Sequence, residues 1–450
     1  MQSFEIDKTD LQRIKTALDG EDAELQSVLK EYHASEIAIL FEKLPQEAKE
    51  RIINILPADI ASEVISEMDE EHHPGELLIN LHPEKRSEIV EELDYDDATD
   101  IISQLEEHEQ QEILEDLDEE DATSIRALLS YDENTAGGLM NSELIKVNIK
   151  LDKKGALDEI IRQSEEMEEF YTIYVVDDSN TLKGIVSIKN IIKAHADAKI
   201  KNILKADPVF VKADLDQEEV AKLISQYNLT AIPVVDDEMK LLGRITVDDI
   251  IDVMEEESTE DILKISGVSE DEELSGNWQD AVKSRLPWLI VNLGTAFLAA
   301  SVIRHYSSIA AQLPVIVAYL TIISGMGGNT ATQALAVTVR RISLSDLSDN
   351  QAYRTVLKEF SVGLVNGAIN GLIVCLFALF YDSNPMLGLV LFLAMTGNLI
   401  VAGITGASIP LVLKRVGIDP AVASSIIITT FTDCIGFLLP LWLATNLLLH

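Results

Sequence analysis

Hydrophobic residues in the first part of the chain recur at helical spacing, but only in short runs. A leucine followed by a helix-breaking residue interrupts the runs every 12 or 13 residues, as at Leu44-Pro45, Leu56-Pro57 and Leu93-Asp94. A helix this short is marginal alone and cannot bury its own apolar face, so neighbouring helices must stack on it. The pattern predicts an all-α superhelical domain over residues 1–130.

A different pattern follows a glycine-containing connector at residues 131–141. Strand-like runs alternate with helical ones, and the same order occurs twice, in residues 138–200 and 201–255. The duplication is clearest where residues 173–178 match 232–237 and residues 184–190 match 243–249. We expect strands at residues 143–147, 172–176, 183–188, 209–211, 231–235 and 241–245, and helices at 155–168, 188–195, 217–227 and from 247 onward.

This α/β pair resembles a tandem of CBS domains, a regulatory module that often binds adenine nucleotides. The resemblance implies that ribose-holding positions fall on Ser187 with Asn190, and on Thr246 with Asp249. ATP is therefore one implied ligand, and a CBS pair that binds no nucleotide is the alternative.

A long helix rich in carboxylates is predicted from residue 248, in a connecting segment that extends to residue 275. Like charges three and four positions apart destabilise an isolated helix by about 0.2–0.5 kcal/mol each. Bound divalent cations would relieve this repulsion. The alternative is a solvated linker, which is what runs of charge usually form.

The last part of the chain contains five long apolar runs, at residues 287–304, 313–338, 361–381, 387–412 and 421–448. Each is long enough to cross a hydrocarbon core of about 30 Å. The sequence thus predicts a membrane domain over residues 284–450, with five transmembrane helices and the lipid bilayer as its environment.

Two kinds of glycine pattern occur inside these spans. Gly363, Gly367 and Gly371 recur every four residues, which permits close helix packing. Gly325-Met326-Gly327-Gly328-Asn329 and Thr396-Gly397-Asn398 combine glycine with amides, and for them we expect irregular backbone that is buried in protein or lines a water-filled path.

One carboxylate, Asp433, lies inside the last apolar run. An ionisable residue at the centre of a span costs about 2.5–3.5 kcal/mol on insertion scales, so it usually faces a bundle interior or a water-filled path. Helical spacing puts Ser425, Thr429 and Gly436 on the same face. This polar stripe suits a pore; the alternative is a protonated or internally paired structural aspartate.

Charge divides the chain sharply. The whole sequence carries 35 Lys and Arg and 77 Asp and Glu, and residues 284–450 hold only 8 and 6 of them. The front is therefore an acidic body that is unsuited to nucleic acid, because phosphate contacts need clustered basic residues. Basic residues gather in the loops after the second and fourth spans, which predicts a cytoplasmic N-terminus and a C-terminus outside.

The whole chain resembles the MgtE family of magnesium channels. The resemblance is carried by the domain order and by three motifs: Met326-Gly327-Gly328-Asn329 with Gln333, residues 414–421, and Thr429-Thr430-Phe431-Thr432-Asp433. It implies a homodimer in a cell membrane, a pore at the subunit interface, and Asp433 of each subunit holding a hydrated Mg²⁺. Thr429 and Gly436 are the other pore positions. Mg²⁺ parts with its waters reluctantly, so one or two carboxylates suit it.

The resemblance also implies a sensor, in which the connecting helix plugs the pore when cytoplasmic Mg²⁺ is high. Its cation-binding positions fall on Asp216, Glu218, Asp249, Asp252, Glu257, Glu260, Asp261 and Asp419, with Glu63 and Asp97 as weaker candidates. Asn228 stands where the pattern predicts an acidic residue, which puts one sensor site in doubt.

Three functions are weighed on these grounds: a Mg²⁺-selective channel closed by cytoplasmic Mg²⁺, a broader permease for Mn²⁺, Co²⁺ or Ca²⁺, and a membrane-anchored sensor of divalent cations or nucleotides. An anchor needs neither an intramembrane carboxylate nor glycine-amide motifs. The sequence shows no nucleophile and base arrangement and no phosphate-binding loop of the ATPase type, so no enzyme activity is expected.

Overall fold

The structure is a computed structural model that describes residues 8–41, 43–69, 72–164, 172–269, 272, 277–344, 349–421 and 424–448. The chain forms two compact units, residues 1–255 and 256–450. The division falls within helix α14 (Val247–Ser266).

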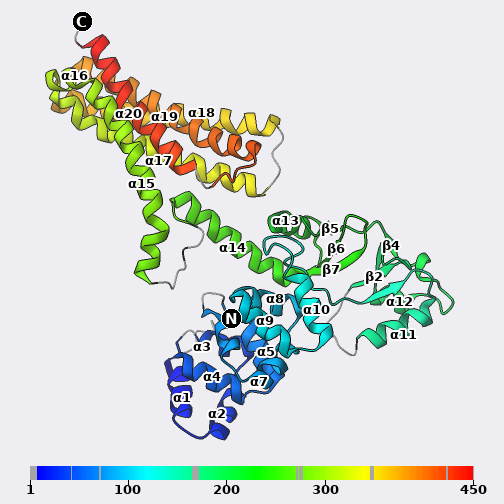
Figure 1. Cartoon of the computed structure of the whole chain (residues 1–450). Coiled ribbons are helices and arrows are strands. Elements are labelled where there is room, and N and C mark those ends of the chain that lie inside the picture. Colours follow the sequence, from blue (N-terminus) through cyan, green and yellow to red (C-terminus); the bar gives the residue numbers. More distant parts are fainter. Residues whose placement is uncertain are drawn as a thin grey trace. The chain divides into compact units, whose positions relative to one another are not determined.

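The first unit begins with ten short helices (Figure 1). Each of several packs mainly on the next but one along the chain: α3 on α5, α5 on α7, α7 on α9 and α8 on α10. This arrangement confirms the predicted all-α superhelix. The helices are α1 (Lys8–Leu18), α2 (Asp22–Leu29), α3 (Ala34–Phe41), α4 (Gln46–Ile55), α5 (Ala58–Ser66), α6 (Pro74–Ile79), α7 (Pro83–Val90), α8 (Tyr95–Ser103), α9 (Glu107–Asp116) and α10 (Glu119–Leu128).

The predicted breaks between these helices recur in the structure for a packing reason. Leu44, Leu56, Leu81, Leu93 and Leu105 each come just after a helix ends, and all are buried in one continuous apolar core. Each leucine therefore seals the end of one helix against its neighbours, while the polar or proline residue after it starts the next helix.

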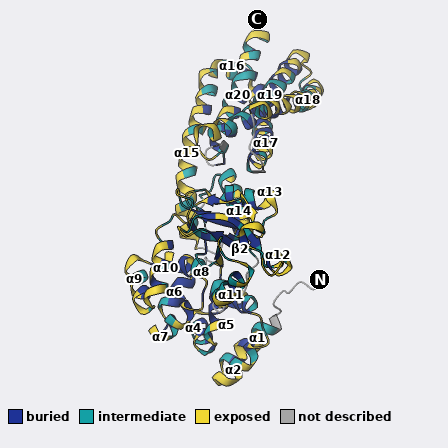
Figure 2. Ribbon diagram, turned by 90° about the vertical axis from the view of Figure 1, so that its right-hand side faces the viewer, coloured by how far each residue is buried: buried dark blue, intermediate teal, exposed yellow. Residues whose placement is uncertain are grey.

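Two sheets follow, and an inner strand of each, Thr172–Val176 and Ala231–Val235, is largely buried (Figure 2). The first sheet has the order β1-β2-β3-β4 and the second β5-β6-β7. In each, a parallel pair precedes an antiparallel pair, so the predicted duplication is confirmed. The strands are β1 (Lys146–Asn148), β2 (Thr172–Val176), β3 (Leu182–Ser187), β4 (Lys205–Ala206), β5 (Val211–Lys212), β6 (Ala231–Val235) and β7 (Leu241–Thr246).

The helices of this α/β pair are α11 (Lys153–Gln163), α12 (Ile188–Lys193), α13 (Gln217–Tyr227) and the first part of α14, with a 3₁₀ turn at Ile200–Asn202. The two-residue strand β4 has no hydrophobic pattern and was not predicted. Part of the helix expected at residues 155–168 lies outside the described residues, as does part of the connecting segment 248–275.

Within the residues described for it, the second unit contains five helices long and apolar enough to span a membrane, as predicted. They are α15 (Trp278–His305), α17 (Pro314–Leu344), α18 (Asp349–Tyr381), α19 (Pro385–Val416) and α20 (Ser424–Leu447), with the short α16 (Ser307–Gln312) between the first two. Helices α17, α18 and α20 all pack on α19 (Figure 1). In its most apolar stretch α19 is 56% buried and α15 only 6%. Helix α19 is therefore the core of this unit.

Close packing between α18 and α19 confirms the expectation for the glycine repeat. A Cβ added to Gly363 would lie 2.5 Å from the Leu399 carbonyl oxygen, and one added to Gly367 would lie 2.8 Å from the Thr396 Cα. Each glycine thus faces the backbone of α19, and no larger residue fits without moving the helices apart.

The expectation of irregular backbone at the other glycine motifs was wrong. Helices α17 and α19 run without interruption through Gly325-Met326-Gly327-Gly328-Asn329 and Thr396-Gly397-Asn398. The reason is packing: Gly327 faces the side chain of Asn398 across the two helices, so its missing side chain makes room for a neighbour instead of freeing the backbone.

Replacing Gly363 by alanine is expected to destabilise the membrane unit by about 1–3 kcal/mol, because overpacking forces the backbones apart. The melting temperature of the full chain in detergent measures this loss. Gly294→Ala is the matched control, since a Cβ at Gly294 would meet nothing within 4 Å. Equal melting temperatures for the two variants would contradict the packing argument.

Candidate functional site

Asp433 lies in the middle of α20 and is held by a neighbouring helix. The hydroxyl of Ser324 on α17 donates a hydrogen bond to one oxygen of the Asp433 carboxylate. Ser324 is 5% exposed, whereas Asp433 is only half-buried. The carboxylate therefore has one oxygen fixed by protein and lies at the edge of the packed unit.

An amide lies beside this pair. Asn398 on α19 is fully buried, and its Nδ2 donates to the carbonyl of Ile323, 2.8 Å away. A Cβ added to Gly436 would lie 2.9 Å from the Ser324 Cα and 3.2 Å from Asn398 Nδ2. The structure thus places Gly436, one turn after Asp433, in close contact with both α17 and α19.

The other residues of the predicted polar stripe lie along α20. Thr429 and Ser425 are half-buried, and the Thr429 hydroxyl donates to the Ser425 carbonyl of its own helix, 2.9 Å away. Thr432 is fully buried, with its hydroxyl bonded to the carbonyls of Ile428 and Thr429. Because these hydroxyls donate within the helix, their oxygens remain available to accept hydrogen bonds. Such a face suits contact with the waters of a hydrated cation.

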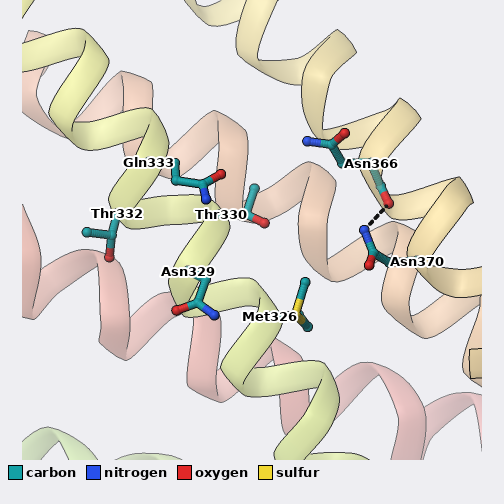
Figure 3. A pocket seen from close by; sticks show the side chains of 7 residues that line it. All are labelled: Met326, Asn329, Thr330, Thr332, Gln333, Asn366 and Asn370. Carbon is teal, nitrogen blue, oxygen red and sulfur yellow. Dashed lines mark hydrogen bonds between the residues drawn. The ribbon is translucent and has the colours of Figure 1, made fainter.

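A polar pocket of about 530 Å³ opens between α17 and α18 (Figure 3). Its lining contains four carboxamides and two hydroxyls, an unusual set for membrane-spanning helices. The Asn370 Nδ2 donates to the Asn366 carbonyl, 2.9 Å away, so this amide is partly satisfied by its own helix. The lining residues are Met326, Asn329, Thr330, Thr332, Gln333, Asn366 and Asn370.

A second candidate site lies in the first unit, where carboxylates of the helical domain meet the start of α14. Loss of solvation, together with the charges of Asp94, Asp249, Asp248 and Glu67, raises the pKa of Asp97 to about 7. Burial, together with the charges of Asp249 and Asp97, raises the pKa of Asp96 well above its usual range, and burial raises that of Asp249. These negative charges repel one another and favour any cation that bridges them.

Hydrogen bonds of Asn141 connect Asp96 of this cluster to strand β7. The Asn141 Nδ2 donates to the Asp96 carboxylate at 3.0 Å, and the Asn141 backbone exchanges hydrogen bonds with Arg244 of β7. Glu67 adjoins the cluster, while Glu63, one turn earlier on α5, is exposed. Among the described residues no group of three or more His, Cys, Asp or Glu forms a ready-made metal site.

The raised pKa of Asp97 predicts a pH dependence of stability in the presence of a chelator. An unfolded aspartate has a pKa of about 3.9. The folded unit holds the proton more tightly, so its stabilising effect is complete below pH 4 and disappears as pH rises through about 7. The melting temperature of the full chain should therefore fall between pH 5 and 8, by roughly 2–4 °C for each kcal/mol lost.

Asp97→Asn should flatten this fall, because the amide carries no charge at any pH. Glu107→Gln is the control, since Glu107 is exposed on α9. A fall of the same size in the Asp97→Asn protein would contradict the assignment of the raised pKa to Asp97.

The candidate nucleotide positions sit at equivalent strand-to-helix junctions. Ser187 caps α12 and accepts a hydrogen bond from the Asn190 backbone at 3.3 Å. Thr246 instead uses its hydroxyl and backbone N–H to donate to the Asp249 carboxylate, at 2.7 and 3.0 Å. The polar groups of the second repeat are therefore bonded to each other, and Asp249 also belongs to the acidic cluster.

Asp216 and Glu218 lie at the start of α13 and have local roles. Asp216 caps the helix by accepting from the Glu218 backbone at 2.9 Å, and the Glu218 carboxylate pairs with Lys222 at 3.2 Å. Asn228 ends the same helix with φ 50°. Asparagine is one of the few residues that adopt this left-handed conformation readily, so Asn228 suits the end of the helix.

The second half of α14 meets the membrane unit through charged groups. Lys264 pairs with Glu260 on its own helix and with Asp419, 3.0 Å away, in the segment before α20. The Ser343 hydroxyl of α17 donates to Asp261 at 3.2 Å. Asp252 and Glu257 lie on the same helix, and burial beside Glu255 and Asp248 raises the pKa of Asp252.

Several residues of these sites were not predicted from the sequence. Ser324 lies far along the chain from Asp433, as Lys264 does from Asp419, and no local pattern singles out either residue. Asp94 and Asp96 lie within three residues of the candidate Asp97. The acidic run Asp94-Tyr95-Asp96-Asp97 could therefore have pointed to them.

Comparison with known families divides the chain in the same order as its architecture. The family described as "Divalent cation transporter" matches residues 320–443, the "MgtE intracellular N domain" matches residues 32–134, and the CBS domain matches residues 136–197 and 200–256.

Curated relatives extend over most of the chain. The "Magnesium transporter MgtE" of Thermus thermophilus is 32% identical over 436 residues, which cover 96% of each protein. The protein of the same name from Enterococcus faecalis is 37% identical over 314 residues, covering 70% of this chain and 69% of the relative.

A solved structure matches the first unit. It is the crystal structure of the cytosolic domain of the Mg²⁺ channel MgtE in complex with ATP, which is 34% identical with a TM-score of 0.51. The match covers 54% of this chain and 99% of that one.

Proposed function

This chain belongs to the MgtE family, a family of magnesium transporters, and from that premise we propose that it is a Mg²⁺-selective channel closed by cytoplasmic Mg²⁺. The chain is a multi-pass membrane protein with five candidate spans. Mg²⁺ enters down its electrochemical gradient, because two charges that cross 100 mV gain about 4.6 kcal/mol. No catalytic role is assigned.

The observation that carries the proposal is the carboxylate of Asp433 in the middle of α20. It is half-buried, bonded to Ser324, and lies on the helix face that also carries Ser425, Thr429 and Gly436. A charge at this depth is costly and therefore rare, and those that occur commonly mark the path of an ion, which suits a carboxylate and a cation.

The small number of carboxylates fits a hydrated ion. Mg²⁺ keeps several of its waters and is commonly bound through one or two carboxylates. We propose that the chain is a homodimer in which two copies of Asp433 face one hydrated Mg²⁺. Thr429 and the rest of the polar face would accept hydrogen bonds from its waters.

The acidic groups of both units supply the sensor in this proposal. Asp97, Asp249 and their neighbours repel one another, and Mg²⁺ bound among them stabilises the compact, closed form. When cytoplasmic Mg²⁺ is low, repulsion separates these surfaces and the pore opens. Lys264 already supplies one positive charge between Glu260 and Asp419. Fewer bound cations are therefore needed to neutralise this site than the acidic cluster around Asp97.

We also propose that ATP binds between the CBS repeats and modulates this closure. One support is the match to the ATP complex. The other is the Ser187 hydroxyl, whose oxygen accepts a long hydrogen bond of 3.3 Å from the Asn190 backbone N–H. By the distribution of basic residues, the first unit is cytoplasmic and the C-terminus is outside.

Uptake by liposomes that contain the purified chain tests the proposal against its closest alternative. Equal inward gradients of Mg²⁺, Mn²⁺, Co²⁺ and Ca²⁺ are applied separately, and each uptake rate is compared with that of protein-free liposomes. The proposal predicts that Mg²⁺ enters fastest. Equal rates for all four ions would favour the broader permease, and no uptake of any would favour an anchored sensor.

A further inference from the structure

We propose that Ser324 and Asn398 are positioning residues that hold the Asp433 carboxylate at the place where it distinguishes hydrated Mg²⁺ from other cations. The inference rests on the proposed function, since it requires Asp433 to be the group that meets the ion. Neither residue needs to touch the ion. Ser324 acts on the carboxylate directly, and Asn398 acts through the helix that carries Ser324.

The contact between Ser324 and Asp433 fixes the carboxylate. Ser324 is 5% exposed and its hydroxyl donates to one carboxylate oxygen. Gly436, one turn after Asp433, lets the two helices approach until an added Cβ would be 2.9 Å from the Ser324 Cα. At this separation the short serine side chain spans the gap. With one oxygen held, the carboxylate cannot rotate freely, so its other oxygen has a set direction.

Asn398 fixes the helix that carries Ser324. Its Nδ2 donates to the carbonyl of Ile323, the residue immediately before Ser324. Two glycines make room for the amide: a Cβ on Gly327 would lie 2.2 Å from Nδ2, and one on Gly436 would lie 3.2 Å from it. The carboxamide of α19 therefore contacts both α17 and α20 at the level of the Ser324–Asp433 hydrogen bond.

The Oδ1 atom of Asn398 indicates that this residue does not serve stability alone. Its Oδ1 is buried and, within the described part of the chain, accepts no hydrogen bond. An unsatisfied buried amide oxygen is unfavourable, and an apolar side chain of similar size would avoid that cost. The amide instead donates a hydrogen bond to the Ile323 carbonyl, which fixes the position of α17 beside α19.

Position matters here because the ion keeps its waters. A carboxylate that binds through water recognises the size of the hydration shell, which is larger for Mn²⁺ and Ca²⁺ than for Mg²⁺. A carboxylate that rotates freely still attracts cations but recognises their shells less well. Loss of Ser324 should therefore lower selectivity more than it lowers the rate of uptake.

The test compares Ser324→Ala, Asn398→Ala and Asp433→Ala in liposomes, with the ratio of Mg²⁺ to Mn²⁺ uptake as the readout. Ser324→Ala removes a single oxygen and should lower this ratio about tenfold, as expected for the loss of a hydrogen bond to a charged group. Asn398→Ala should lower it in the same direction. Ser301→Ala is the control, because within the described residues the Ser301 hydroxyl bonds to the Leu298 carbonyl of its own helix and to no other helix.

Ser324→Cys retains a weak donor of similar shape and should give an intermediate ratio. It also serves if the alanine variant fails to elute as a single species in detergent. Wild-type ratios in the Ser324 and Asn398 variants, together with no uptake by Asp433→Ala, would overturn the positioning inference and leave the proposed channel intact. Wild-type uptake by Asp433→Ala would instead overturn the proposed function itself.

Discussion

Asp433→Ala is expected to reduce Mg²⁺ uptake by liposomes to the level of protein-free liposomes. The substitution removes the carboxylate that lies in the middle of α20 and is bonded to Ser324. Without it α20 has no charged side chain to offset the cost of bringing a divalent cation into the low-dielectric interior. Uptake measured with a Mg²⁺-sensitive dye inside the liposomes gives the result directly.

Two further variants separate charge from folding in this experiment. Asp433→Asn keeps the shape and the ability to accept from Ser324 but loses the charge, and it should be as inactive as the alanine variant. Asp280→Asn removes an exposed carboxylate at the start of α15 and should leave uptake unchanged. Normal uptake by Asp433→Asn would show that the charge is not required.

The second large effect is expected at the acidic cluster. Asp97→Asn combined with Asp248→Asn removes two charges from a group of carboxylates whose mutual repulsion raises the pKa of Asp97. Less repulsion means that the compact form needs less Mg²⁺ to assemble. Uptake at low Mg²⁺ on the side of the first unit should therefore fall, and the ratio of uptake at low to uptake at high Mg²⁺ should approach one.

Thermal stability provides an independent readout of the same variant. Added Mg²⁺ should raise the melting temperature of the wild-type chain, since a ligand that binds the folded state stabilises it. It should raise that of the double variant much less. Glu107→Gln is the control for both readouts. A double variant that responds to Mg²⁺ like the wild type would show that this cluster is not part of the sensor.

Much of the architecture was predictable because it depends on local signals. The leucine-breaker steps gave the helix ends of the first domain, and the duplicated segments around 173–178 and 232–237 gave two sheets with strands β2 and β6 at the expected residues. Five apolar runs gave five spans. Each of these signals lies within one short stretch of chain, so no knowledge of tertiary contacts was needed.

The parts of the sites that depend on contacts between distant segments were not predictable. Asp433 stood out as a charge in an apolar run, but Ser324 is one serine among several and gains its meaning only from its hydrogen bond. Asn398 was singled out for the wrong reason, as a mark of irregular backbone. The sequence also could not reveal that Lys264 pairs with Asp419, which lies more than 150 residues further along the chain.

The most direct test of the account is Mg²⁺ uptake by liposomes bearing the wild-type chain, measured at low and at high Mg²⁺ on the side of the first unit. The account predicts rapid uptake at low Mg²⁺ and little uptake at high Mg²⁺, because Mg²⁺ bound to the acidic groups closes the pore. Uptake that is the same at both concentrations would contradict the sensor. Uptake no greater than that of protein-free liposomes at either concentration would contradict the channel.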